Sequence, residues 1–480
     1  LSLPQSLTYL DFGDSFDRPI LPGMLPSSIT SLRFGKGFNQ MIAPDTLPSS
    51  LNSLSLGRSF SQTITPGALP TSLESLTITQ GAILDSRSLP PSLITLIVLE
   101  YFYNDRFSQH ILLPHTLQTL VLPFFFDFPL IDGVSGMAIL PQSIRKLKFG
   151  VGFNQQLPVG SLPSSLTELN LGGYNHPVTL TDCLASSSSS QITSLTFGDS
   201  FNQGIMPGAL PQSLTLLSLG IQFNQEIAQG VLPESLGTLI TKSKYLVKVA
   251  GWSYPKSLTS MLIGFEYTIE RESIPSSLTS LECIDTNMDL SGNLPQLGSL
   301  VELKFAPDYK CIFEGNDSAF SSIRCLELGK RLAKYGRYAS VPEMLTHLTL
   351  SGWKDFGFLH KTLEGTQPRR INLLIKEMLN IGVGANVPPS SISLKSFTLW
   401  GTIHSGRRGG RRIPNREAQF VQTLVANVPN VELYRIGFQY DQEYGFQKTV
   451  HVRMIDEQHA ACIIRVHVQR DQYNDYDPLY

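Results

Sequence analysis

Residues 25–46 read LPSSITSLRFGKGFNQMIAPDT, and the architecture follows from the pattern in these residues. Leu32 and Phe34 are two positions apart, so they lie on one face of a short strand, while Arg33 points to the other face. Gly35 then allows the chain to turn. The stretch lacks the roughly ten residues of helical periodicity that a helix needs. It therefore predicts one short strand followed by a return made of turns and extended backbone.

The same pattern recurs along most of the chain, with a spacing of 22 residues in its most regular part. Its head, Leu-Pro-x-Ser/Thr-Leu/Ile, begins at Leu3, Leu25, Leu47, Leu69, Leu89, Leu113, Leu140, Leu162, Leu210 and Leu232, and degenerate heads follow at Tyr254, Ile274 and Val341. A single unit cannot bury its Leu/Phe/Ile face, but units stacked on one another can. The sequence therefore predicts a mainly β repeat solenoid with one short parallel strand per unit.

The repeats change in regularity along the chain. We expect residues 1–369 to form the solenoid, regular to about residue 240 and degenerate after it. Residues 370–480 are expected to hold the last degenerate repeats and a small α+β C-terminal cap, which closes the end of the solenoid. Pro414–Val428 fits a helix, since a proline starts it and another follows its end. Alternating apolar residues predict two strands, around Val452 and Val466, joined as a hairpin.

The unit resembles the FNIP repeat, a relative of the leucine-rich repeat. Residues 25–42, 140–157 and 210–227 match its pattern, Leu-Pro-x-Ser-Leu-Thr-x-Leu-x-Leu-Gly-x-x-Phe-Asn-Gln-x-Ile, nearly throughout. The resemblance is strong over residues 1–240 and weakens beyond them. It implies a horseshoe-like fold similar to that of leucine-rich repeats, and a role in protein interaction. Some family members carry an N-terminal F-box, which joins them to ubiquitin ligases as the part that recognises substrates; these residues contain none.

One feature departs from ordinary leucine-rich repeats, which place an asparagine three residues after the last strand leucine. Here the asparagine falls five residues after the last strand position and follows a phenylalanine, as in Phe38-Asn39, Phe153-Asn154, Phe201-Asn202 and Phe223-Asn224. The spacing therefore argues against a conventional asparagine ladder. It predicts instead that phenylalanines stack from unit to unit as an internal spine.

Composition argues against several functional classes. Charged residues make up 16% of the chain and the net charge is −2, so no basic face for nucleic acid is expected. No apolar run reaches the roughly 18 residues that a membrane span needs. Five scattered cysteines without metal-ligand spacing indicate reduced core residues and a cytoplasmic protein. We therefore expect no cofactor, no metal and no membrane span.

The remaining motifs favour structural roles. There is no Walker A loop, His-Glu-x-x-His or Gly-x-Ser-x-Gly motif, so no enzyme is predicted. Gly35-Lys36-Gly37 and Gly150-Val151-Gly152 are similar to phosphate loops, but no helix follows them. No zinc-ligand spacing occurs in the C-terminal cluster of His451, His459, Cys462 and His467. The basic run at residues 406–412 is interpreted as a surface insertion rather than a phosphate grip or a nuclear signal.

The outward strand positions are the predicted functional surface. Most are small and uncharged, but in the middle of the regular repeats Ile97 and Val121 are each followed by aromatic residues. Large aromatics on an otherwise polar surface are typical of recognition hot spots. The predicted partner-binding residues are Arg33, Ile97, Tyr101, Tyr103, Val121, Phe124, Phe125 and Phe126. The alternative is that the longer loops bury these rings locally.

Two functional hypotheses follow from this surface. The first is a non-enzymatic scaffold that presents its repeat surface to a protein partner. The alternative is a glycan-binding or adhesive surface protein, in which the Ser/Thr/Asn surface and the aromatic rings would hold sugars. An F-box or another adaptor ahead of Leu1 would favour the scaffold, and a signal peptide would favour the adhesin.

Overall fold

The computed structural model describes residues 3–79, 82–99, 112–177, 183, 190–243, 254–264, 275–284, 298–305, 322–328, 344–350, 371–380, 394–403, 416–427, 431–440, 446–454 and 460–468. The chain divides into two compact units, unit 1 (Leu1–Leu258) and unit 2 (Thr259–Tyr480). The division falls inside the expected solenoid, close to the point where the sequence repeats lose their regularity.

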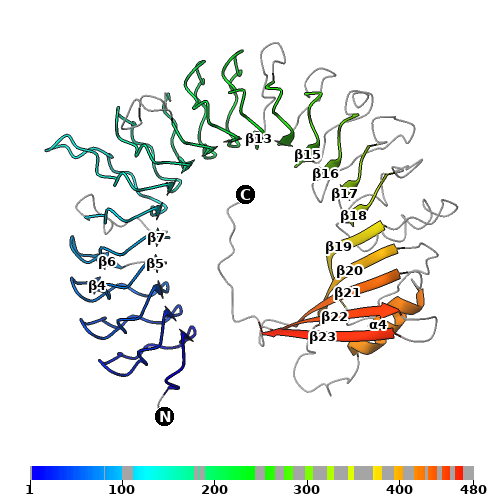
Figure 1. Cartoon of the computed structure of the whole chain (residues 1–480), viewed down its shortest axis with the longest axis horizontal. Coiled ribbons are helices and arrows are strands. Elements are labelled where there is room, and N and C mark those ends of the chain that lie inside the picture. Colours follow the sequence, from blue (N-terminus) through cyan, green and yellow to red (C-terminus); the bar gives the residue numbers. More distant parts are fainter. Residues whose placement is uncertain are drawn as a thin grey trace. The chain divides into compact units, whose positions relative to one another are not determined.

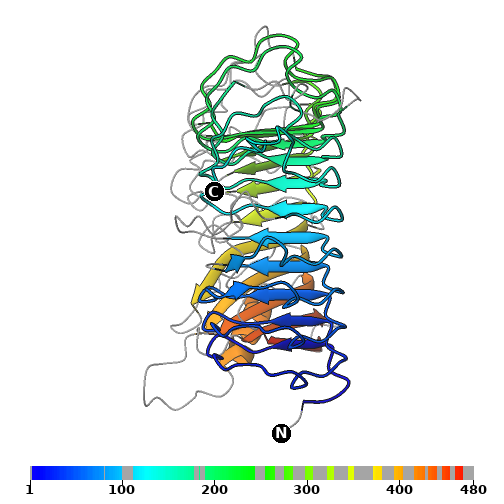
Figure 2. The same cartoon turned by 90° about the vertical axis from the view of Figure 1, so that its left-hand side faces the viewer.

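Unit 1 is a stack of short parallel strands, one per repeat, each paired with the next along the chain. The strands are β1 (Tyr9–Asp11), β2 (Ser31–Arg33), β3 (Ser53–Leu56), β5 (Ser75–Ile78), β7 (Thr95–Val98), β8 (Thr119–Val121), β9 (Lys146–Lys148), β10 (Glu168–Asn170), β11 (Ser194–Thr196), β12 (Leu216–Leu219) and β13 (Thr238–Thr241). Figure 1 labels several of them, and Figure 2 shows the blue and cyan ones as stacked arrows. Two further strands, β4 (Thr63–Ile64) and β6 (Ile83–Leu84), pair on the return segments. The predicted parallel-strand solenoid is confirmed.

Burial alternates along most strands of unit 1, as the sequence pattern predicts; β1 and β12 are exceptions. In β3, Leu54 and Leu56 are buried, while Ser53 and Ser55 are half-buried on the opposite face. The apolar residue that ends the head, for example Leu51, is also fully buried in every unit 1 head after the first. Each such side chain contributes roughly 1.5–3 kcal/mol through its removal from water. The apolar interior therefore runs continuously from repeat to repeat and stabilises the stack.

The glycine after the strand is required by close stacking and not by an unusual backbone angle. The φ of Gly35 lies outside the left-handed region. A Cβ at Gly35 would overlap the carbonyl oxygen of Gly13 in the preceding repeat, and a Cβ at Gly57 would overlap that of Gly35. The chain turns at Lys36 and Gly37, directly after Gly35, as expected, and the missing side chain of Gly35 also lets successive repeats approach.

The phenylalanine spine is confirmed. Phe38 and Phe60 lie in successive repeats, and their rings stack with centroids 6.0 Å apart. Phe201 and Phe223 stack in the same way at 5.9 Å. All four rings are essentially inaccessible to water. The spine forms a second column of buried side chains beside the strand leucines.

Asparagine side chains also form a ladder, which the sequence argument did not expect. Asn154 Oδ1 accepts the backbone N–H of Asn175 at 2.9 Å, and Asn175 Oδ1 accepts that of Asn202 at 2.9 Å. Asn202 Oδ1 continues the series to the N–H of Asn224 at 2.8 Å. The Gln225 side chain donates a second hydrogen bond to the same Asn202 oxygen at 3.0 Å. An asparagine ladder is therefore present, two residues later in the repeat than in ordinary leucine-rich repeats. The Phe-Asn-Gln motif supplies both a ring to the core and an acceptor for a backbone N–H of the next repeat.

A serine ladder joins the repeat heads. Ser28 Oγ donates to the carbonyl oxygen of Leu7 at 2.8 Å, and Ser50 Oγ donates to that of Ile29 at 2.7 Å. Equivalent hydrogen bonds are made by Ser72, Ser92, Ser143, Ser165, Ser213, Ser235, Ser257, Ser299 and Ser322. The hydroxyl of the Leu-Pro-x-Ser head thus binds each repeat to the one before it.

Unit 2 continues the parallel pattern with longer strands toward its end. Its parallel strands are β14 (Ser260–Ile263), β15 (Ser280–Cys283), β16 (Glu302–Phe305), β17 (Cys325–Leu328), β18 (His347–Leu350), β19 (Ile371–Asn380), β20 (Leu394–Ile403) and β21 (Val431–Tyr440). The short strands follow the predicted Leu-x-Leu cores. The ten-residue strands β19–β21 are longer than the sequence pattern predicts.

The C-terminal elements are found where the sequence predicts them. Helix α4 (Arg416–Asn427) lies within the predicted helical stretch and buries Phe420 and Leu424. Strands β22 (Phe446–Met454) and β23 (Ala460–Val468) pair antiparallel as a hairpin, and β22 also pairs with β21. The only helix among the labelled elements is α4, so the protein is mainly β in the part that the structure describes.

Candidate protein-binding surface

The outward side chains of β1–β3, β5 and β7–β13 form two rows, and we call these two rows the strand face of unit 1. Pairing in register places equivalent residues of successive repeats beside one another, as in Ser53, Ser75 and Thr95. These hydroxyl side chains are half-buried and uncharged. The buried leucines behind them hold the backbone in place. The strand face is therefore a mostly polar, uncharged surface on a backbone of defined position. An apolar or charged side chain on it differs from its neighbours.

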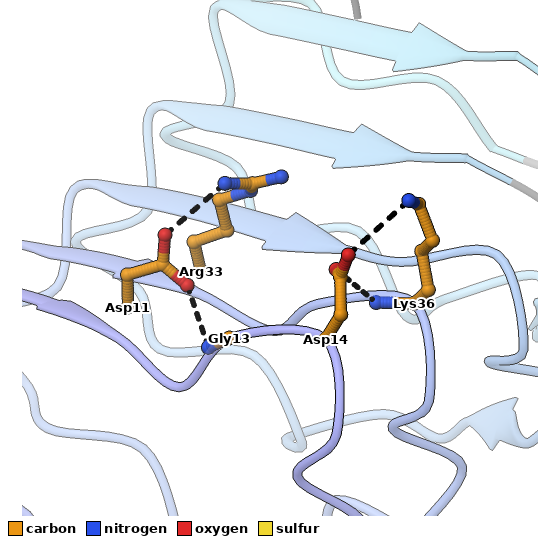
Figure 3. Close-up of polar contacts among 5 residues, drawn as sticks. All are labelled: Asp11, Gly13, Asp14, Arg33 and Lys36. Atoms are coloured by element: carbon orange, nitrogen blue, oxygen red, sulfur yellow. Dashed lines mark hydrogen bonds and ion pairs between the residues drawn. The ribbon is translucent and has the colours of Figure 1, made fainter. Parts of the chain in front are cut away.

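Arg33 is held at the N-terminal end of this surface (Figure 3). Its Nη1 lies 3.1 Å from Oδ2 of Asp11, whose side chain is only 6% exposed and whose Oδ1 accepts the N–H of Gly13 at 2.8 Å. Close by, Lys36 Nζ lies 3.2 Å from Oδ2 of Asp14. A hydrogen bond from the backbone N–H of Lys36 lowers the pKa of the Asp14 carboxyl. The predicted site residue Arg33 thus joins the first two repeats in addition to facing outward.

Ile97 and Val121 lie side by side on the strand face. They are register partners in β7 and β8, and both are half-buried. The next register position is Lys148 in β9. Among the described residues Lys148 forms no ion pair, whereas its neighbour Lys146 lies 2.7 Å from Glu168. The structure therefore brings an apolar pair and a cation together. The apolar pair was predicted as part of the binding surface from the sequence, and Lys148 was not.

Phe124 and Phe125 follow β8 and are half-buried, with their rings in an edge-to-face contact at 4.8 Å. Their backbones lie against the next repeat, where a Cβ at Gly150 would overlap Phe124 and one at Gly152 would lie 2.7 Å from the Phe125 Cα. Gly150 and Gly152 therefore serve repeat stacking. Both phenylalanines remain candidates for a partner surface.

Phe126 belongs to the core, so its placement on the binding surface is wrong. It is 5% exposed, and its ring stacks on that of Phe153 at 6.3 Å. It occupies the spine position, four residues after Leu122, and the following Asp127 accepts the N–H of Asn154 at 2.8 Å. Counting from the strand would have found this role, because Phe-Asp here takes the place of Phe-Asn.

Several predicted positions fall outside the described residues. Tyr101 and Tyr103 are among them, as are His459 and the basic run 406–412. The side chains of His451, Cys462 and His467 are likewise not described. In the ranges that the structure does describe, no three His, Cys, Asp or Glu side chains are grouped so as to hold a metal ion. The same ranges contain no helix with the length and apolar character to cross a membrane.

Comparison with known proteins identifies the repeat. The family model of the FNIP repeat matches residues 1–37, 38–80, 137–174, 174–222 and 201–244. Among solved structures, CroV588, described as a novel circular leucine-rich-repeat protein, is 26% identical with a TM-score of 0.49, over 78% of this chain and 67% of its own. An internalin from Listeria monocytogenes is 12% identical with a TM-score of 0.30, over 66% of this chain and 83% of its own. No curated protein matches the chain. The units within residues 1–80 and 137–244 are therefore similar to the FNIP repeat, as the sequence predicts.

Proposed function

We propose that this protein is a non-enzymatic scaffold that binds a protein partner through the strand face of unit 1. The observation that carries the proposal is the apolar pair Ile97 and Val121 on adjacent strands, with Phe124 and Phe125 half-buried at the end of β8. A few desolvated apolar groups carry most of the binding energy of protein interfaces. The surrounding hydroxyl side chains would then form the polar rim.

The fold supports this proposal. A stack of FNIP repeats presents one long surface whose side chains are set by the register of the strands, which suits recognition of a macromolecule. Lys148 next to Val121 adds one cation to the apolar pair and so favours a partner with an acidic group beside its apolar anchor. A cytoplasmic location is part of the proposal, on the basis of the scattered cysteines.

The test compares two double variants of the full chain as immobilised bait. Ile97→Thr/Val121→Thr keeps β-branched side chains like those of the neighbouring threonines. The amount of partner protein that this variant retains should fall roughly tenfold or more below that of the wild type. The matched control Val151→Thr/Val159→Thr changes two exposed valines outside the strands and should retain the same partner. Equal retention by both variants, at unchanged melting temperature, would rule out this surface. If the wild-type chain binds sugars on a glycan array and Ile97→Thr/Val121→Thr does not, the adhesin is favoured instead.

A further inference from the structure

A separate hollow of about 1000 Å³ lies on the outward side of β18–β21 in unit 2. It is wide enough for a peptide segment or a ligand of similar size. Its first row of side chains is His347, Asn372, Ser396 and Leu433, which are register partners on four successive strands. None of these residues belongs to the surface proposed above, so the hollow is a second candidate site.

A directional chain of hydrogen bonds fixes the floor of this hollow. Ser396 Oγ donates to Asn372 Oδ1 at 2.7 Å, and Asn372 Nδ2 lies 3.0 Å from His347 Nε2. Since an amide nitrogen only donates, Nε2 accepts, and the imidazole carries its proton on Nδ1, 3.0 Å from Thr346 Oγ1. Thr346 Oγ1 in turn donates to the carbonyl oxygen of Arg324 at 3.0 Å.

The amide of Asn372 is held from both sides and keeps capacity to spare. One Nδ2–H is used by His347 and one lone pair of Oδ1 by Ser396. One N–H and one lone pair are left to face a ligand. A donor and an acceptor side by side match the N–H and C=O of an extended polypeptide backbone. The floor is therefore suited to a peptide segment.

Charges and apolar side chains surround this amide. Lys395 and Arg435 line the hollow, are exposed, and form no ion pair among the described residues, while Glu432 is the one carboxylate in the lining. Leu374 and Leu433 add half-buried apolar surface. Two cations against one carboxylate leave a positive excess on the β20 and β21 side.

Next to the hollow, beyond β18, the strands β15–β17 carry the reverse charge, and none of their residues lines the hollow. The register partner of Thr349 in the neighbouring strand β17 is Glu327. Glu302 lies 3.0 Å from Lys304 in β16, and Glu282 is the register partner of Lys304. Three carboxylates around one ammonium group leave these strands negative. An acidic ligand group is therefore repelled by β15–β17 and attracted by β20 and β21.

We propose that the hollow over β18–β21 binds an extended peptide segment of a protein partner, with an acidic side chain placed between Lys395 and Arg435 and a neighbouring apolar side chain against Leu374 and Leu433. The Asn372 amide pairs with the backbone of the segment. The site lies in unit 2, so it is independent of the surface proposed on unit 1.

The experiment measures fluorescence anisotropy of two labelled peptides with the full chain. Both peptides have blocked ends and a Gly/Ser frame; one carries Asp-Leu-Asp-Leu at its centre and the other Lys-Leu-Lys-Leu. The acidic peptide should bind the wild-type chain at least about tenfold more tightly than the basic one, and salt should weaken its binding. Equal binding of the two peptides, or no binding of the acidic one up to about 1 mM, would overturn the proposal.

Charge reversal tests the position of the site. Lys395→Glu/Arg435→Glu should bind the basic peptide in preference to the acidic one, by about tenfold. The control Arg58→Glu/Arg87→Glu makes the same change in net charge at exposed positions of unit 1 and should behave like wild type. If the control variant changes peptide preference as strongly, long-range charge explains the result and the site is rejected. Ile97→Thr/Val121→Thr should bind the acidic peptide as the wild type does. Failure of the proposal for unit 1 can therefore be distinguished from failure of the proposal for unit 2.

Discussion

At the scale of single residues, small polar side chains hold each repeat to its neighbour. The Ser50 hydroxyl donates to the carbonyl oxygen of Ile29 in the preceding head, and Asn39 Oδ1 accepts the N–H of Ser61 in the following repeat. Both side chains satisfy main-chain groups that the short strands leave without partners. They explain why the recurring motif contains Ser and Asn at positions that do not face the apolar core.

Ser50→Ala removes one rung of the serine ladder. It leaves the Ile29 carbonyl with one fewer partner in a half-buried position, so we expect a loss of about 1 kcal/mol in the free energy of unfolding. Ser53→Ala is the matched control, because the Ser53 side chain faces outward and should change stability by less than about 0.5 kcal/mol. Urea unfolding of the two variants checks this. Equal midpoints would show that the ladder contributes nothing.

Asp17 takes the place of the ladder asparagine in the first repeat, and it titrates. Hydrogen bonds from the Gln40 side chain (2.8 Å) and then from the backbone N–H of Asn39 (2.9 Å) lower the pKa of the Asp17 carboxyl. Gln40→Ala should therefore raise this pKa toward the usual 3.8. Because the folded-state pKa is the depressed one, the stabilisation is present at neutral pH and is lost as the pH falls through it.

Carbon NMR titration of aspartate-labelled protein measures the pKa of Asp17 directly. Gln62→Ala is the control, since Gln62 donates to Asn39, which does not titrate. A pKa of Asp17 that stays the same in Gln40→Ala and in the wild type would contradict the proposed hydrogen bond.

At the scale of elements, the phenylalanine spine is the part of the core that distinguishes these repeats. The centroid of the Phe38 ring lies 3.9 Å from that of Phe34, which follows β2 in the same repeat, and 6.0 Å from that of Phe60 in the next repeat. Each spine ring therefore packs along the repeat and across it. Removing one ring should affect two repeats at once.

Phe60→Ala should lower the free energy of unfolding by about 3–5 kcal/mol, because it empties a fully buried aromatic site. Phe125→Ala, at a half-buried ring, should cost clearly less. Denaturant unfolding of both variants tests the difference. A cost below about 1 kcal/mol for Phe60→Ala would mean that the spine is not a core element.

Prediction from the sequence succeeded where periodicity is strong. Leu54 and Leu56 show the two-residue alternation of a strand, and Phe420 and Leu424 show the four-residue spacing of a helix; the structure confirms both elements. Phe126 was misplaced because its repeat has an unusual length and Asp127 hides the Phe-Asn motif. The hollow of unit 2 gave no sequence signal, since the pairing of Asn372 with His347 depends on strand register across 25 residues.

At the scale of the whole molecule, the central claim is that stacking of equivalent repeats makes the fold. The rings, ladders and glycines described above act between neighbouring repeats, so stability is a sum of repeat and interface contributions. The first and third repeats both contact the second one through equivalent residues. Phe16 and Phe60 stack on either side of Phe38. Asn39 donates its backbone N–H to Asp17 of the first repeat and accepts from Gln62 of the third. A chain without the second repeat could therefore close the gap with the same contacts.

The most direct measurement is the thermal unfolding of a chain from which residues 25–46, one whole repeat, have been deleted. The account predicts a folded protein with a cooperative transition, because β1 can pair with β3 in the register that β2 now uses. The full-length variant Leu32→Asp/Phe34→Asp should lose the structure of this region, since it buries two carboxylates without partners. If the clean deletion unfolds the chain as thoroughly as the two aspartates do, the repeats are not interchangeable units and the solenoid account is contradicted.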